Sequence, residues 1–119
     1  MKINKFEDIE AWQEARVLTN LIYNLNKNGK ISKDFGLKDQ LQRASVSIMA
    51  NIAEGFDSRS NNYFINFLSY AYRSASEVQS LIYVAKDQNY YSPEQFNKIY
   101  KLSAKIKGLI GGFIKYLKK

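Results

Sequence analysis

The sequence predicts an all-α domain whose four helices pack as an antiparallel up-down-up-down bundle. The 119 residues contain a single proline, Pro93, so little in the chain interrupts long helices. Apolar residues recur at steps of three and four through most of the sequence, which is the period of one helix face. The predicted connections are roughly four to eight residues long, and short connections make neighbouring helices antiparallel. We therefore expect one domain built around one core.

The first helix is predicted to span residues 9–26, where apolar side chains recur at helical spacing. Acidic residues crowd its start, and the helix dipole favours negative charge at that end. The polar stretch 27–34 follows, and it offers Ser32 or Asp34 as the N-cap of the next helix. We therefore expect a loop between the first two helices.

The second helix is predicted over residues 35–56 and the third over residues 63–88. The polar sequence 58–62 separates them as a turn. The third helix has the clearest apolar stripe, because apolar residues follow one another on one face from Phe64 to Ala85.

The fourth helix is predicted over residues 93–117, and its start is the best defined. Ser92 stands at the N-cap, Pro93 at the first helical position and Gln95 at the third. Serine and glutamine at this spacing form a capping box, and proline is favoured at the first position of a helix.

The composition excludes most catalytic and metal-binding chemistry. The chain has no cysteine and no histidine, which removes thiol nucleophiles, cysteine/histidine zinc sites and the Ser-His-Asp triad. Di-iron helical bundles also need histidine, and no phosphate-binding glycine loop is present. Ser103 and Lys107 have the spacing of a Ser-Lys dyad, but no oxyanion-hole motif accompanies them. We therefore predict no enzyme, no catalytic residue, no metal and no cofactor.

Membrane insertion and export are not expected. The uncharged stretch Gly108–Ile114 is far shorter than the roughly 20 residues that cross a bilayer. The N-terminal segment carries acidic residues where a signal peptide would have an apolar core. We expect a cytoplasmic protein.

The net charge of +7 lies in one segment. Residues 1–94 hold 11 basic and 11 acidic residues, whereas residues 95–119 hold seven lysines and no acid. Such asymmetry favours a polyanionic partner, and lysines hold a nucleic-acid backbone through counterion release. No motif for reading bases is present. The predicted RNA- or DNA-binding residues are Lys98, Lys101, Lys105, Lys107, Lys115, Lys118 and Lys119, with Arg43 and Arg59 extending the surface.

Three other interpretations of these lysines remain open. They form a solvated, solubilising face, or they dock an acidic protein onto a purely structural or protein-interaction module. The segment 105–119 also has the composition of a cationic amphipathic helix that lies on a membrane surface. Its apolar stripe is needed to complete the four-helix core, so we expect no membrane partner.

The helices carry more apolar or small residues than one core stripe requires. Three glycines near the end of the fourth helix each cost about 1 kcal/mol relative to alanine, and Gly108 and Gly112 have the i, i+4 spacing that lets another backbone approach closely. A fraying last turn is the alternative. We predict self-association through Val46, Met49, Ala53, Phe56, Ile65, Tyr72, Ala104, Gly108 and Gly112.

The second helix also carries recognisable motifs. These are Phe35-Gly-Leu37, Gln40-Leu-Gln-Arg43-Ala44, Ser45-Val46-Ser47-Ile48 and Asn51-Ile-Ala-Glu-Gly55, with Phe64-x-x-Phe67-Leu68 in the third helix. The sequence resembles the four-helix bundle protein family that is encoded by intervening sequences in bacterial 23S ribosomal RNA genes. The resemblance covers nearly the whole chain. It departs at Met49, where members commonly have proline, and between Asn26 and Asp34, where the proline of the members' loop is missing.

The resemblance implies a homopentameric barrel with no established enzymatic activity. Similar proteins include the accessory subunit of diversity-generating retroelements, which is a basic barrel. That barrel binds nucleic acid and a reverse transcriptase. For the present chain, a reverse transcriptase is expected as a partner only in a retroelement. The family motif Ser47, Asn51, Glu54 and Gly55 is predicted to be structural. Asn51 and Glu54 would cap or bridge helices, and Gly55 would permit the exit turn.

Overall fold

Four long helices make up most of the protein. The computed structural model describes residues 2–119, and within that range it contains no strand. The helices are α1 (Glu10–Asn26), α2 (Phe35–Asp57), α3 (Asn61–Asp87) and α4 (Pro93–Leu117), with two short 3-10 helices, η1 (Phe6–Asp8) and η2 (Lys30–Lys33). The predicted all-α fold of four helices is confirmed.

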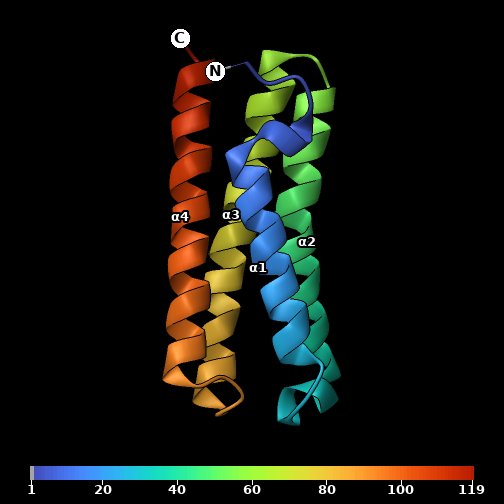
Figure 1. Cartoon of the computed structure of the whole chain (residues 1–119), viewed down its shortest axis with the longest axis vertical. Coiled ribbons are helices and arrows are strands. Elements are labelled where there is room, and N and C mark those ends of the chain that lie inside the picture. The colour runs from blue at the N-terminus through green and yellow to red at the C-terminus, as the bar shows by residue number, and fades with distance from the viewer. Residues whose placement is uncertain (1) are drawn as a thin grey trace.

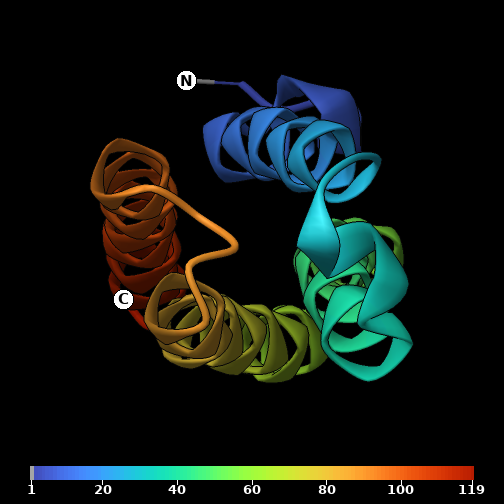
Figure 2. The same cartoon turned by 90° about the horizontal axis from the view of Figure 1, so that it is seen from below.

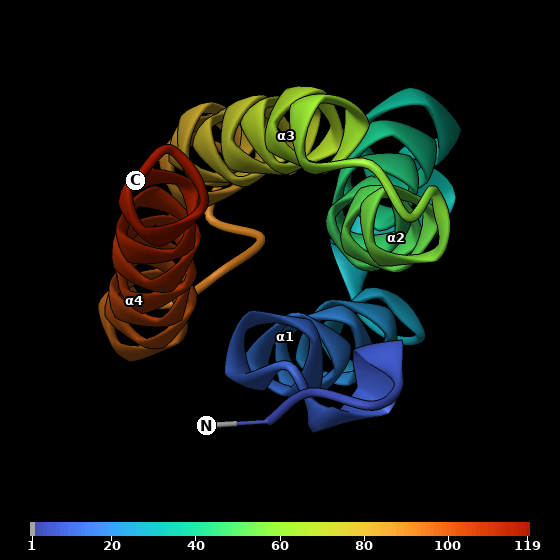
Figure 3. The same ribbon diagram turned by 90° about the horizontal axis from the view of Figure 1, so that it is seen from above.

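The four helices stand side by side, and consecutive helices are joined at alternating ends of the molecule (Figure 1). Both chain termini lie at the same end (Figure 1). α1 contacts α2 and α4, and α3 contacts the same two helices. α2 and α4 therefore stand across the bundle from each other (Figures 2 and 3). α1 and α2 form one side of the molecule, and α3 and α4 form the opposite side (Figure 3).

The starts of α1 and α2 differ in how they are capped. α1 begins at Glu10, one residue after the predicted start, because Ile9 has extended backbone geometry and its side chain is buried. Asp34 caps α2, and its carboxylate accepts a hydrogen bond from the backbone N–H of Leu37 at 3.2 Å. Of the two candidates for this cap, Asp34 is therefore the one used. Part of the predicted loop before it is the 3-10 helix η2.

α3 and α4 are both capped by serine. α3 begins at Asn61 rather than at residue 63, because the Ser60 hydroxyl accepts a hydrogen bond from the backbone N–H of Tyr63 at 3.4 Å. The predicted capping box of α4 is confirmed. The Ser92 hydroxyl accepts from the Gln95 N–H at 3.1 Å, and the Gln95 side chain accepts from the Ser92 N–H at 2.9 Å.

Two tyrosines tie the connection between α3 and α4 to the rest of the bundle. The Tyr91 hydroxyl donates to the Asn26 side-chain oxygen at 2.6 Å, within the buried end of the core, and burial raises the pKa of Tyr91 above its ordinary value. The Tyr90 hydroxyl donates to the Asp34 carboxylate at 3.1 Å. The bottom of the bundle in Figure 1 is therefore held by specific hydrogen bonds as well as by apolar packing.

Gly55 has a different role from the predicted one. It lies inside α2 and is buried, so it does not form the exit turn. A Cβ atom at this position would stand 2.8 Å from Cδ1 of Phe64 and 2.8 Å from Cβ of Phe67. α3 therefore packs directly against the α2 backbone at Gly55, where a larger residue would overlap Phe64 and Phe67.

Replacing Gly55 with alanine is expected to destabilise the fold, because the added methyl group overlaps two α3 side chains. Overpacking of this kind costs about 1–3 kcal/mol, which urea denaturation measures as a lower midpoint. Gly108→Ala is the matched control. Nothing lies within 4 Å of its new methyl group, so it should raise stability by about 0.5–1 kcal/mol. Equal effects of the two substitutions would show that the contact with α3 is unimportant.

Candidate functional site

The seven lysines of residues 95–119 lie on the solvent side of α4. Lys98, Lys101, Lys105, Lys115, Lys118 and Lys119 are exposed, and Lys107 is half-buried. The opposite side of the helix carries Ile99, Ile106 and Ile110, which are completely buried. The arrangement follows from the helical period, because the apolar stripe enters the core and turns the lysines outward.

One of these lysines is paired with an acid. Lys105 Nζ lies 2.6 Å from Glu14 Oε2, across the seam between α1 and α4. This hydrogen bond, together with the charge of Glu14, raises the pKa of Lys105. Lys105 therefore helps to join α4 to α1, and its charge is largely balanced. The other six lysines of the segment have no carboxylate partner within residues 2–119.

The two arginines predicted to extend the surface lie elsewhere. Arg43 is on α2 and forms an exposed ion pair with Asp39 at 2.7 Å. Arg59 lies in the connection between α2 and α3, with a backbone φ of 59°. Because α2 stands across the bundle from α4 (Figure 3), the structure does not bring Arg43 together with the lysines.

A groove of about 620 Å³ runs along the outside of the bundle between α3 and α4. It contains four of the residues predicted for self-association, together with two of the predicted nucleic-acid-binding lysines. Its lining residues are Tyr72, Gln79, Tyr100, Ala104, Lys107, Gly108, Gly111, Gly112 and Lys115. The predicted basic surface and the predicted small-residue face of α4 therefore overlap.

Lys107 is held in place within this groove by neutral groups. Its ammonium group donates to the Gln79 side-chain oxygen at 3.0 Å and stands 5.0 Å from the centre of the Tyr72 ring. The Gln79 amide nitrogen donates in turn to the backbone oxygen of Tyr100 at 3.3 Å. Sequence reasoning did not single out Gln79 or Tyr100. Their helical positions beside Tyr72 and Lys107 become meaningful only when α3 and α4 are packed together.

The α2 side chains predicted for self-association are less exposed than expected. Val46 is 42% exposed, and Ala53 is half-buried. Met49 and Phe56 pack against the core, and the Phe56 ring meets the Phe64 ring edge to face at 6.1 Å. Val46 is thus the most exposed member of this set, whereas Phe56 contributes to the margin of the core. Ile65, on α3, is half-buried.

The family motif forms a polar link between α2 and α3. The Asn51 amide donates to the backbone oxygen of Ser47 at 2.8 Å and to its hydroxyl at 3.0 Å. The Ser74 hydroxyl donates to the Ser47 hydroxyl at 3.0 Å. Ser47 and Ser74 thus bridge the helices, and Asn51 orders Ser47. Glu54 is exposed.

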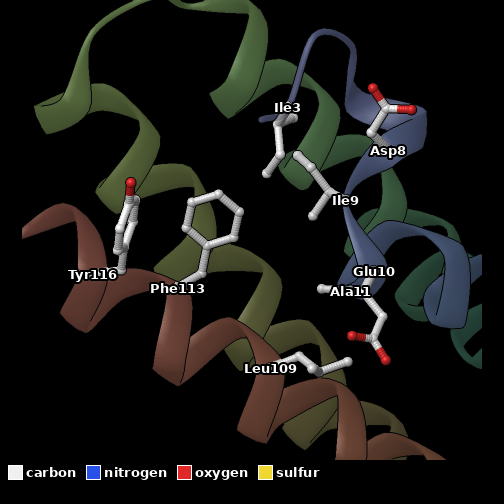
Figure 4. A pocket seen from close by; sticks show the side chains of 8 residues that line it. All are labelled: Ile3, Asp8, Ile9, Glu10, Ala11, Leu109, Phe113 and Tyr116. Atoms are coloured by element: carbon white, nitrogen blue, oxygen red, sulfur yellow. The ribbon is translucent and has the colours of Figure 1, made fainter. Parts of the chain in front are cut away.

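A second pocket, of about 270 Å³, lies between the start of α1 and the end of α4 (Figure 4). Phe113 projects from α4 toward Ile3 and Ile9, and Leu109 faces Ala11 (Figure 4). No motif in the sequence indicated this pocket, because it depends on how the N-terminal segment crosses the bundle.

The structure also tests the chemistry that the residue spacing suggested. The Ser103 hydroxyl is buried and donates to the backbone oxygen of Ile99 at 2.8 Å, while Lys107 binds Gln79. These two side chains therefore do not form a dyad. Within residues 2–119 no three Asp or Glu side chains gather as metal ligands would. In the same range, no helix has the length and apolarity of a transmembrane span.

Comparison with known proteins identifies the family. A family model described as 23S rRNA-intervening sequence protein matches residues 7–112. The chain belongs to this family. The resemblance seen in the α2 motif is thereby confirmed. Comparison with curated proteins gave no match.

A solved structure shares the fold. It is a crystal structure of a protein of unknown function from the S23 ribosomal protein family of Bacteroides thetaiotaomicron VPI-5482. The two proteins are 27% identical, and the alignment covers 88% of this chain and 95% of that one with a TM-score of 0.81. The four-helix arrangement is therefore common to both proteins.

If the family motif is structural, Ser47→Ala should lower stability without altering nucleic-acid binding. Loss of the Ser47 hydroxyl removes its hydrogen bonds to Asn51 and Ser74, and a net cost of about 1 kcal/mol is expected. Thermal unfolding measures the loss. Ser80→Ala, at an exposed α3 position, serves as the control and should be neutral. Weaker nucleic-acid binding at unchanged stability would assign the motif to a binding surface instead.

Proposed function

We propose that this antiparallel four-helix bundle is a non-enzymatic protein that assembles as an oligomer and binds the backbone of RNA or DNA through α4. The observation that carries the proposal is the location of the charge. All of the net +7 comes from residues 95–119, and of those lysines only Lys105 is paired with a carboxylate within residues 2–119. The remaining ammonium groups are available to an anion.

The spacing of the lysines supports a long polyanionic partner. From Lys98 to the end of α4 at Leu117 the helix extends roughly 29 Å at 1.5 Å per residue, and Lys118 and Lys119 follow directly. Duplex DNA carries a negative charge about every 1.7 Å of its axis, so a nucleic acid lying along α4 presents many phosphates to these side chains. Contacts of this kind depend on backbone charge and shape rather than on base sequence.

Assembly into a ring would multiply this charge. A closed ring requires each copy to contact its two neighbours through different faces. The face of α2 that bears the exposed Val46 and the half-buried Ala53 is suited to one of these contacts. Because α2 stands across the bundle from α4, a neighbour bound at this face leaves the α4 lysines of the same copy uncovered. Five copies, the number implied by the family resemblance, would place five α4 surfaces on one particle.

Nucleic-acid affinity should fall steeply with salt concentration. Filter binding is expected to give a negative slope of log affinity against log salt, with a contribution of about 0.9 per phosphate contact. Changing Lys101 and Lys119 together to glutamine should make the slope shallower by about 2. The charge-matched control changes Lys27 and Lys30, which lie between α1 and α2, and should keep the original slope.

A slope near zero, or no binding at about 50 mM salt, would remove the nucleic-acid proposal. The second candidate, a module that docks an acidic protein through the same lysines, predicts a different result. A partner that stays attached after nuclease treatment in a pull-down would favour it.

The assembled particle should have a mass several times that of the 13.8 kDa chain, as determined by light scattering. Val46→Glu is expected to shift the protein toward smaller species, because a charge buried against a neighbouring copy is costly. Val17→Glu, at a 54% exposed position on α1, is the control and should leave the mass unchanged. A single 13.8 kDa species at high concentration would contradict self-association.

A further inference from the structure

A row of exposed tyrosines follows the groove between α3 and α4. Tyr72 is 39% exposed, Tyr83 is 50% exposed and Tyr100 is 36% exposed. Tyr72 and Tyr100 both line the groove, and the Tyr83 ring continues the row 6.2 Å from the Tyr100 ring. The Tyr100 ring stacks on Phe96 at 5.7 Å, and the Lys107 ammonium stands over the Tyr72 ring at 5.0 Å. Each ring therefore has one face engaged within the chain, and its opposite face is the surface on which another ring can stack.

Positive charge in the groove is not cancelled by acid. None of the residues that line it is aspartate or glutamate, and two of them are lysines. The Lys107 ammonium is positioned by the Gln79 amide oxygen and the Tyr72 ring. Both partners are neutral, so they orient the ammonium group and leave its charge uncompensated. Lys115 adds a second ammonium group farther along α4.

The floor of the groove is open down to the α4 backbone. At Gly108, Gly111 and Gly112 nothing lies within 4 Å of the position that a Cβ atom would occupy. Three glycines in one helix segment weaken that helix, and nothing within this chain requires them for packing. A ligand that approaches the backbone closely would use the space that they leave.

We propose that the groove between α3 and α4 binds a single strand of nucleic acid, with bases stacked on Tyr72 and Tyr100 and phosphates at Lys107 and Lys115. The inference rests on the proposed function and names the form of nucleic acid. Single-strand sites combine aromatic platforms with a basic channel, and the stacking tolerates any base. Exposed tyrosines and lysines occur together in the groove between α3 and α4.

The dimensions of the groove favour a single strand over a duplex. Packed helices lie about 8–10 Å apart, so the groove between them is too narrow for a double helix, which lies across the outer lysines instead. The lining residues from Tyr100 to Lys115 extend about 22 Å along α4. A strand of several nucleotides fits this length.

A helix from a second copy is the competing occupant. The α2 face around Val46 carries two exposed acids, Asp39 and Asp57, and Asp39 is already paired with Arg43 at 2.7 Å. A second copy would therefore leave at least one of the two groove lysines without a free carboxylate, and burial of unpaired charge is costly. A phosphate backbone supplies the negative charge and also reaches the glycine positions. The observations therefore favour nucleic acid over a second copy.

Fluorescence anisotropy with labelled oligo(dT) and oligo(U) of about 10 nucleotides, and with a blunt duplex of the same length, tests the inference in the full chain. Tyr100→Leu should weaken single-strand binding on the order of tenfold and leave duplex binding unchanged. Tyr72→Leu should weaken single-strand binding by at least as much, because it also removes the ring that supports the Lys107 ammonium. Tyr63→Leu, at a 62% exposed α3 position outside the groove, is the control and should match the unsubstituted protein.

A second variant tests the open space at the glycine positions of α4 rather than the tyrosine rings. Gly108→Leu combined with Gly112→Leu fills the open floor of the groove, and leucine favours the helix more than glycine does, so the fold should persist. Single-strand binding should be lost while salt-dependent duplex binding continues. Both results together would support the inference.

Other outcomes would overturn it. Equal weakening of single-strand and duplex binding by the tyrosine variants would remove the single-strand site and leave the proposed function standing. Dissociation of the double leucine variant into 13.8 kDa chains, with unchanged single-strand affinity, would assign the groove to a second copy. If the unsubstituted protein bound neither probe, the inference and the proposed function would fail together.

Discussion

Burial of the inner stripe of α4 is the interaction on which the rest of the molecule depends. Ile99, Ile106 and Ile110 have no exposed surface, and complete burial of such a side chain is worth about 1.5–3 kcal/mol. This burial closes the bundle against α1 and α3, and it also determines the rotation of α4. With the rotation set, the lysines can only point outward, so the stability of the core and the direction of the positive charge are consequences of the same packing.

The α2 and α3 pair shows a second way in which packing controls local chemistry. Gly55 admits Phe64 and Phe67 close to the α2 backbone, and Ser47 meets Ser74 in the same interface. A glycine and two serines replace larger apolar residues where two helices come together closely. The most recognisable sequence motif of the 23S rRNA-intervening sequence protein family therefore lies, in this chain, at a helix contact rather than in an open site.

The outer side of α4 has to reconcile two requirements that one surface rarely meets at once. Small residues favour close approach by another molecule, whereas ammonium groups resist being covered by anything neutral. A phosphate backbone, the partner that we propose, would satisfy both, because it brings negative charge and has little bulk at its linkages. The neutral support given to Lys107 by Gln79 and Tyr72 fits this requirement, since it orders the side chain without neutralising it.

Much of the fold was accessible from the sequence alone, including the four helices, the capping box at Ser92, the family and the concentration of charge after Glu94. These features are local, because helical period, caps and charge counts depend on residues close together in the chain. Tertiary structure decided the close approach at Gly55, the inward direction of Ser103, the separation of Arg43 from the lysines and the meeting of Gln79 with Lys107. Each of these depends on the rotation and separation of two packed helices, and that geometry is set by the side chains of the whole core.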